Sequence, residues 1–197
     1  MSILAFLVYS TVYGQHKLPA TDNQQVTHVK IKATIIGFLK WYKKEQADTA
    51  KKPYSITKGG YPDTTTDFRI DTAGLEIYLK QFEKTGYVSE TYLNSLRLYF
   101  KRIDDELKLD SRHRQELFKV DGLDNDWVLD TFEPEIILNH IKEGRFDKIS
   151  SIYNKAITRF RISNLVQLLF TLTRYKDKWL IDYIGYDATS QYSMARQ

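Results

Sequence analysis

Apolar residues recur at three- and four-residue steps through the first half of this chain and at two-residue steps in its last third. The first spacing puts apolar side chains on one face of an α-helix, and the second puts them on one face of a β-strand. Because the helices come first and the strands follow, the order favours an α+β fold with N-terminal helices packed on an antiparallel sheet. A chain of 197 residues is long enough to bury such a core within one domain.

Three helices are predicted in the first part of the chain. The first covers residues 26–44, and its apolar positions are Val29, Ala33 and Ile36 together with Ile35, Leu39 and Tyr42. The second begins at Asp71 or Thr72, since both side chains can cap a helix N-terminus, and it ends at Gly86. Ser89 caps the third helix.

The last third of the chain is predicted to form the sheet. Residues 45–71 read as a polar connection, which is either a surface lid or an insertion. Strands are predicted near residues 136–141 and at 156–162, 165–173 and 179–184, and the short turns between the last three indicate antiparallel hairpins. In the last strand we expect Trp179 and Ile181 on one face, and Leu180, Asp182 and Ile184 on the other.

The N-terminus carries the apolar run ILAFLVYSTV from Ile3 to Val12, which is too short to span a bilayer. It matches the centre of a signal peptide, with Val12 and Gly14 at the positions that precede a cut. No Lys or Arg comes before the run, so a buried strand is the alternative. The predicted organisation is a signal peptide at 1–14, a linker at 15–25, one domain at 26–186 and a flexible tail at 187–197. This organisation predicts an exported protein, periplasmic or extracellular, without a transmembrane segment.

Composition and motifs exclude several kinds of chemistry. The chain has no Cys, so disulfides, thiolate metal sites and a cysteine nucleophile are absent. The four His residues do not form a zinc pattern, and the acidic turn at 121–127 lacks the glycine of a calcium loop. No phosphate loop or dinucleotide fingerprint occurs, so we predict neither metal nor cofactor. The lysines around Trp41 suit a solvated helix end, and nucleic acid is not a predicted partner.

Four segments carry a resemblance to a known family: FLKWYKK at 38–44, YVSETYLNSL at 87–96, the acidic turn at 121–127 and TRYKDKWLIDYI at 173–184. In these segments and in the order of its elements, the chain resembles an exported bacterial family of unknown function within the nuclear transport factor 2-like superfamily. The resemblance spans about residues 26–186. It implies a curved sheet wrapped around a helix, a cystatin-like cone with a conical cavity. It implies no one chemistry, because this superfamily hosts isomerases, dehydratases, binding modules and assembly domains.

Aromatic residues make up 14% of the chain, which suits a lined cavity as well as a packed core. The residues that we predict to line the cavity are Trp41, Tyr99, Asp126, Trp127, Phe160, Trp179 and Tyr183. Core packing is the alternative for each aromatic residue among them. No residue is assigned a catalytic role.

The leading hypothesis is an exported, non-catalytic binding or interaction module that holds a small molecule or a protein partner. One alternative is a small cavity enzyme of the isomerase or hydrolase type that uses one buried carboxylate. Asp126 and Asp182 are the candidates for that carboxylate. A second alternative is a periplasmic immunity protein that binds a toxin. The sequence predicts no particular oligomeric state.

Overall fold

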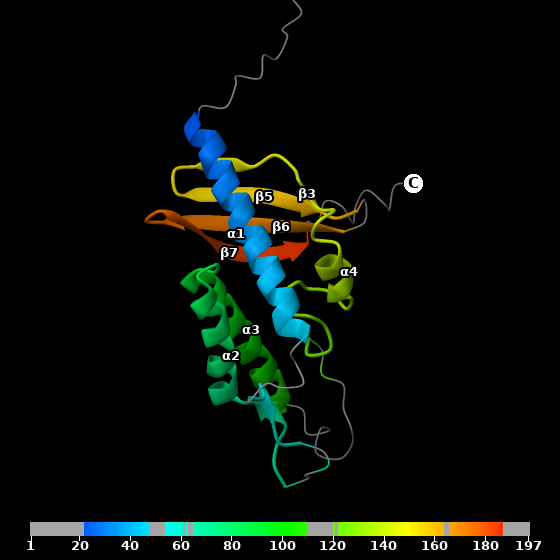
Figure 1. Ribbon diagram of the computed structural model, residues 1–197. Helices are drawn as coiled ribbons and strands as arrows, with labels where there is room; N and C mark the ends of the chain where they lie inside the picture. The colour runs from blue at the N-terminus through cyan, green and yellow to red at the C-terminus, as the bar shows by residue number, and fades with distance from the viewer. Residues whose placement is uncertain are drawn as a thin grey trace, which may run out of the picture.

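The computed structural model describes residues 22–47, 54–60, 62, 65–109, 120, 122–163 and 166–186. Its elements are α1 (Asp22–Ala47), β1 (Thr57–Lys58), β2 (Arg69–Ile70), α2 (Thr72–Thr85), α3 (Glu90–Leu109), α4 (Pro134–Asn139), β3 (Arg145–Phe146), β4 (Ser150–Ile152), β5 (Lys155–Arg161), β6 (Gln167–Tyr175) and β7 (Lys178–Tyr186). The helix α1 crosses one face of a curved antiparallel sheet and continues past its β7 edge toward α2 and α3 (Figure 1). The predicted α+β class, with helices first and the sheet from the C-terminal part, is confirmed.

The sheet has the strand order β3-β5-β6-β7, with β4 paired to β5 as well. Along β5 the burial alternates strictly, so that Ala156, Thr158 and Phe160 are buried while Ile157 and Arg159 are exposed. This alternation confirms the predicted strand and its two faces. The strands β5, β6 and β7 pair antiparallel in chain order, as expected, and β4 adds a pairing with β5 that was not predicted.

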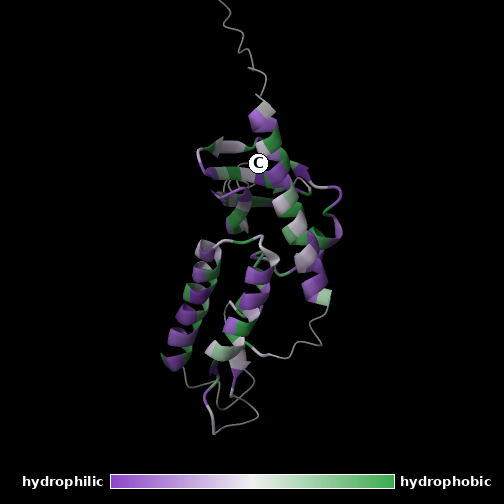
Figure 2. Ribbon diagram, turned by 60° about the vertical axis from the view of Figure 1, so that its left-hand side comes forward, coloured by the Kyte–Doolittle hydropathy of each residue, from purple (hydrophilic) through white to green (hydrophobic). Residues whose placement is uncertain are grey.

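The helix α1 connects the sheet to the other helices. It buries Ile31, Ile35, Phe38, Leu39 and Tyr42. The Thr34 hydroxyl donates to the carbonyl oxygen of Trp179 in β7 at 3.2 Å. Val29 and Ala33, expected on the apolar face, are exposed, because the helix packs along the line that contains Ile35 and Leu39. In Figure 2 hydrophilic and hydrophobic residues alternate along the long helices, as in helices that bury one face.

The helix α2 begins and ends where the sequence predicts, and α3 begins where the sequence predicts. Of the two candidate caps the structure uses Asp71, whose carboxylate accepts the backbone N–H of Ala73 at 3.2 Å. Gly86 ends α2 in the left-handed conformation, with φ of 66°. The Ser89 hydroxyl accepts the backbone N–H of Tyr92 at 3.3 Å and so caps α3.

The turn between α2 and α3 is fixed to the edge strand β7. The backbone N–H of Ser89 donates to the carbonyl oxygen of Ile181 at 2.9 Å, and the N–H of Ile181 donates to the carbonyl oxygen of Tyr87 at 2.8 Å. Val88 and Ile181 therefore form a short parallel bridge. The turn between α2 and α3 is thus hydrogen-bonded to the sheet, and these bonds fix the position of the helical hairpin beside β7.

A β-bulge interrupts β7 at Asp182. The pairing register shifts between Thr171 and Leu172 of β6, so Asp182 has no partner across the ladder. Before the bulge Trp179 is buried, as predicted. After it the alternation is reversed, and Ile184 is buried at 7% exposure. The expectation that Ile184 shares the face of Asp182 is therefore wrong, since an extra residue turns the following side chains to the other face.

The Asp182 carboxylate joins the helical hairpin to two strands. One oxygen accepts the Ser89 hydroxyl at 2.6 Å, and the other accepts the Lys155 ammonium at 3.0 Å and the Thr173 hydroxyl. Its side chain is only 9% exposed. Burial acts to raise the pKa of Asp182, but the hydrogen bonds from Ser89, Thr173 and Lys155 outweigh it and hold the pKa below its ordinary value.

Two local predictions are corrected by the structure. The strand expected at 136–141 is mostly the helix α4, which starts with Pro134 and buries Ile137 and Leu138. A strand cannot bury two adjacent side chains on one face, whereas a helix can. The polar connection at 45–71 contains the small ribbon of β1 and β2, which the polar composition conceals.

The predicted linker also ends earlier than expected. Residues 22–25 form the first turn of α1, because apolar spacing reveals only the part of a helix that packs and not a polar overhang. The predicted signal peptide at 1–14, the linker up to residue 21 and the tail at 187–197 lie outside the described residues. Within the part of the chain that the structure describes, every helix is too short or too polar to cross a membrane.

The buried face of β7 leads to a stability prediction. Replacing Trp179, which is 3% exposed, by Ala should lower the free energy of unfolding by about 3–5 kcal/mol, since it leaves a large cavity in the core. Urea denaturation measures this change. The matched control is Tyr175→Ala, at a position 61% exposed, which we expect to change the free energy by about 0.5 kcal/mol or less. Equal effects of the two changes would contradict the core position of Trp179.

The Asp182 cluster predicts an acid-sensitive contribution to stability. Because the folded-state pKa lies below the ordinary value of about 3.9, this contribution is present above that pH and is lost as the pH falls through the lowered pKa. Asp182→Asn should therefore destabilise most at neutral pH, by about 1–3 kcal/mol, and progressively less toward acid. Denaturation across this range tests the trend, with Asp177→Asn in the exposed turn as the control at neutral pH. A destabilisation that does not change with pH would show that the negative charge of Asp182 does not contribute to holding the helical hairpin on the sheet.

Candidate functional site

The acidic turn closes as a small loop between Asp126 and Thr131. The backbone N–H of Asp126 donates to the carbonyl oxygen of Thr131 at 2.7 Å, and the N–H of Thr131 donates back at 3.2 Å. Inside the loop, Oδ1 of Asp126 accepts the backbone N–H groups of Val128 at 3.0 Å and Leu129 at 2.8 Å. The carboxylate therefore holds its own loop, as a capping side chain holds the first turn of a helix.

The other oxygen of Asp126 binds the loop to α1. Oδ2 accepts the Tyr42 hydroxyl at 2.7 Å and the Gln46 side-chain amide at 2.7 Å. These two donors are one helical turn apart, so they share a face of α1. Burial raises the pKa of Asp126, and the hydrogen bonds from Tyr42, the loop backbone and Gln46 oppose this rise without cancelling it.

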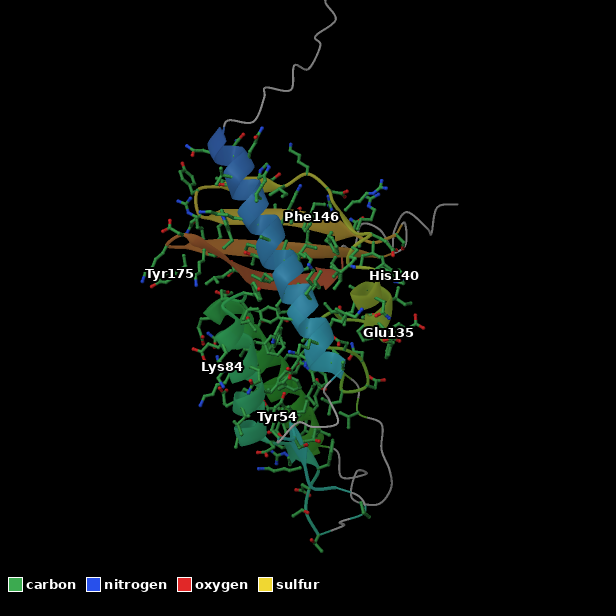
Figure 3. The ribbon with its side chains drawn as sticks, in the orientation of Figure 1. Tyr54, Lys84, Glu135, His140, Phe146 and Tyr175 are labelled. Atoms are coloured by element: carbon green, nitrogen blue, oxygen red, sulfur yellow. The ribbon has the colours of Figure 1, made fainter. Side chains whose placement is uncertain are left out.

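Asp126 stands at the side of a pocket of about 550 Å³. The pocket lies between the C-terminal end of α1, the segment around β1, the helix α2, the acidic loop and the start of α4. Figure 3 labels Tyr54 and Glu135, which reach it from the segment before β1 and from α4. Its described lining consists of Tyr42, Gln46, Tyr54, Ser55, Ile56, Tyr78, Asn125, Asp126, Trp127, Phe132, Pro134 and Glu135.

Aromatic side chains form a fixed wall of this pocket. The Trp127 indole N–H donates to the Tyr78 hydroxyl at 3.2 Å, and the two rings meet edge to face with centroids 6.2 Å apart. The ring of Tyr54 lies 5.9 Å from that of Tyr78, and its hydroxyl donates to Glu45 at 3.3 Å. Burial raises the pKa of Tyr78, and burial with the Glu45 carboxylate raises the pKa of Tyr54 to about 12. Both phenols therefore stay protonated and neutral at physiological pH.

The polar groups of the lining are rich in acceptors. Oδ1 of Asn125 is buried and has no hydrogen-bond partner among the described residues. The amide of the same side chain makes a long contact of 3.5 Å with Asp130. Glu135 is exposed at the rim. The described residues that line the pocket include two carboxylates, and none of them is Lys, Arg or His.

Of the seven predicted lining residues, the structure brings only Asp126 and Trp127 together in this pocket. Phe160 and Trp179 are buried in the core on the sheet face toward α1, at 0% and 3% exposure. Tyr183 is 47% exposed and lies on the opposite face of the sheet, which it shares with exposed Ile157.

The remaining two predicted residues, Trp41 and Tyr99, make contacts elsewhere among the helices. The ring of Trp41 packs edge to face on Phe82 with centroids 4.9 Å apart. Tyr99 donates its hydroxyl to the carbonyl oxygen of Gly122 at 2.6 Å and so holds the start of the acidic loop against α3. These residues support the surroundings of the pocket without lining it.

Sequence reasoning missed most of the pocket. The apolar spacing placed Tyr42 on a buried helix face, which is correct as far as its ring is concerned. The spacing of Tyr42 and Gln46 on one helix face could have indicated paired donors. No sequence signal pointed to Tyr54 or Asn125, because both come from irregular segments whose position depends on the fold.

The described residues contain no group of three His, Asp or Glu side chains placed to hold a metal ion. Comparison with known proteins gave no matching family model, no matching curated protein and no matching solved structure. Membership of the nuclear transport factor 2-like superfamily accordingly stays a prediction.

Asp126 leads to a prediction with the opposite pH trend to Asp182. Because its folded-state pKa is raised, its favourable contribution is complete below the ordinary pKa of about 3.9 and is lost as the pH rises through the folded pKa. Asp126→Asn should destabilise by about 1–3 kcal/mol, since the amide of Asn brings N–H donors to a place where the neighbouring groups already donate. The loss should shrink between acid and neutral pH, and urea denaturation measures it.

The control for Asp126→Asn is Glu133→Gln, an exposed carboxylate beside the same loop. We expect it to change the free energy of unfolding by about 0.5 kcal/mol or less. A loss for Asp126→Asn that grows with pH would show that the carboxylate is stabilised in its charged form.

Proposed function

We propose that this chain is a binding module that holds a small organic molecule in the aromatic pocket and performs no chemistry on it. The pocket volume of about 550 Å³ falls within the range of small-molecule sites. The observation that carries the proposal is the saturation of Asp126, the buried carboxylate of the pocket, by donors from its own chain.

A saturated carboxylate is poorly suited to proton transfer. Two donors reach each oxygen of Asp126, and a carboxylate offers about four lone-pair sites in all. A general base needs one of these sites free for the proton that it abstracts. Asp126 is instead placed to keep the acidic loop against α1, and so to keep the pocket open at a fixed width.

The walls also suit binding, because they are formed before a ligand arrives. Trp127, Tyr78 and Tyr54 are held by ring contacts and hydrogen bonds to protein groups. A ligand that enters such a site does not have to order the side chains that receive it, so more of the contact energy appears as affinity.

The second candidate is a small cavity enzyme that uses Asp126. The raised pKa of this carboxyl group beside a pocket is the observation that favours it. An Asp126 carboxyl signal that titrates near pH 6, about where a general acid or base is effective, would support the enzyme over the binding module.

The exported location and the nuclear transport factor 2-like relationship belong to the same proposal. Helices that precede a curved antiparallel sheet support the relationship at the level of architecture. The pocket, however, lies at the far end of α1 from the sheet, among residues that include none from β5, β6 or β7. The proposed binding site is therefore different from a cavity between the helix and the sheet.

Titration with small fragments tests the binding module. A set of neutral, cationic and anionic aromatic fragments is added to the isotope-labelled protein and followed by backbone amide shifts. Fragments that bind should shift the signals of Ile56, Asn125 and Trp127 together. Phe132→Ala removes an exposed ring from the rim, and should weaken these fragments about two- to tenfold.

The control for this titration is Ile152→Ala, which removes an exposed apolar side chain from β4 and should leave the affinities unchanged. Shifts scattered over the surface, or equal effects of the two variants, would reject the pocket as the binding site.

A further inference from the structure

This inference rests on the proposed function. If the pocket holds a small molecule, the charge of its lining indicates the charge of that molecule. Asp126 and Glu135 line the pocket, and Glu45 contacts Tyr54 beside it. None of the described lining residues carries a positive charge at neutral pH. The chain as a whole has a net charge of +4, so the negative character belongs to this site and not to the general field of the protein.

The hydrogen-bonding groups of the pocket point in the same direction. Tyr42 and Gln46 already donate to Asp126, and Trp127 already donates to Tyr78. Oδ1 of Asn125 is a buried acceptor without a partner in the described part of the chain. That oxygen is enclosed by the protein, so the exposed carboxylate of Glu135 is the acceptor that the N–H groups of a ligand can reach.

The aromatic wall accepts positive charge as well. The faces of aromatic rings carry negative electrostatic potential, and they attract amidinium, guanidinium and ammonium groups. Tyr54, Tyr78, Trp127 and Phe132 all line the pocket. Their rings also suit a flat apolar body, which can stack on them or meet them edge to face.

We infer that the pocket selects a flat organic cation that carries N–H donors, an aryl amidinium or guanidinium being the simplest form. The exposed carboxylate of Glu135 forms the ion pair with the cation at the rim. Asp126 supplies negative potential without direct contact, because its oxygens are already occupied. An anion finds no free cationic partner among the described lining residues.

Three probes of nearly the same shape test this selection: benzamidinium, benzamide and benzoate. They differ in charge and share the flat ring, so apolar contact alone would treat them alike. Calorimetric titration of the full chain should give benzamidinium an affinity about fivefold or more above that of benzamide, because the ion pair with Glu135 and the negative potential of Asp126 act together. Benzoate should bind more weakly than either probe.

Two variants test whether the cation binds beside Glu135. Glu135→Gln should weaken benzamidinium about two- to fivefold, the range of an exposed ion pair, and should leave benzamide unchanged. Glu143→Gln is the matched control, because Glu143 is exposed and does not line the pocket.

The outcomes separate this inference from the proposed function. Equal affinities of benzamidinium and benzamide, or tighter binding of benzoate, would overturn the selection for a cation while the pocket stays a binding site. Failure of all three probes would also overturn the inference, and the wider fragment titration then decides whether the pocket binds any small molecule. A loss of benzamidinium binding in Glu143→Gln that equals the loss in Glu135→Gln would show that the cation sits elsewhere on the surface.

Discussion

The packing of Phe82 is the contact on which the helical layer depends. Its fully buried ring lies within contact of five other aromatic rings, which come from three helices: Phe38, Trp41, Tyr42, Tyr78 and Tyr92. Burial of large rings supplies much of the free energy that holds helices together, and edge-to-face contacts fix their orientation. Two of these rings, Tyr42 and Tyr78, continue outward as walls of the pocket. The candidate site is therefore an extension of the core, and its width is set by core packing.

The two buried aspartates show how one residue type can serve opposite electrostatic conditions. Asp182 lies at a bulge, where an ammonium and two hydroxyl groups stabilise its charge and lower its pKa. Asp126 receives only neutral donors in a more enclosed place, and its pKa is raised. Both connect segments that are distant in the sequence, Asp182 joining Ser89 to the sheet and Asp126 joining the acidic loop to α1. Each is an architectural group first, which favours a binding role over a catalytic one for the pocket.

The position of the pocket follows from the two packing partners of α1, which are the sheet and the pair of helices α2 and α3. Its first half packs on the sheet through residues such as Ile31 and Ile35, and its second half packs on α2 and α3 through Phe38 and Tyr42. The C-terminal end of α1 extends beyond the sheet, and the acidic loop and α4 close around it. A hollow with aromatic walls and acceptor groups forms at this end, where regular packing gives way to loops. Loops that are held by a rigid framework are common places for binding sites.

The sequence by itself determined the α+β class, the limits of α2, the start of α3 at its cap Ser89 and the two faces of β5. These features depend on local periodicity and capping, which a short window of sequence contains. Only the tertiary structure decided the bulge at Asp182, the helix α4 and the joining of Asp126 with Tyr42. A bulge depends on the register with a neighbouring strand, and a pocket depends on which distant segments meet. The seven aromatic and acidic residues singled out from the sequence were therefore dispersed, because side-chain type indicates burial but not the neighbours with which a residue is buried.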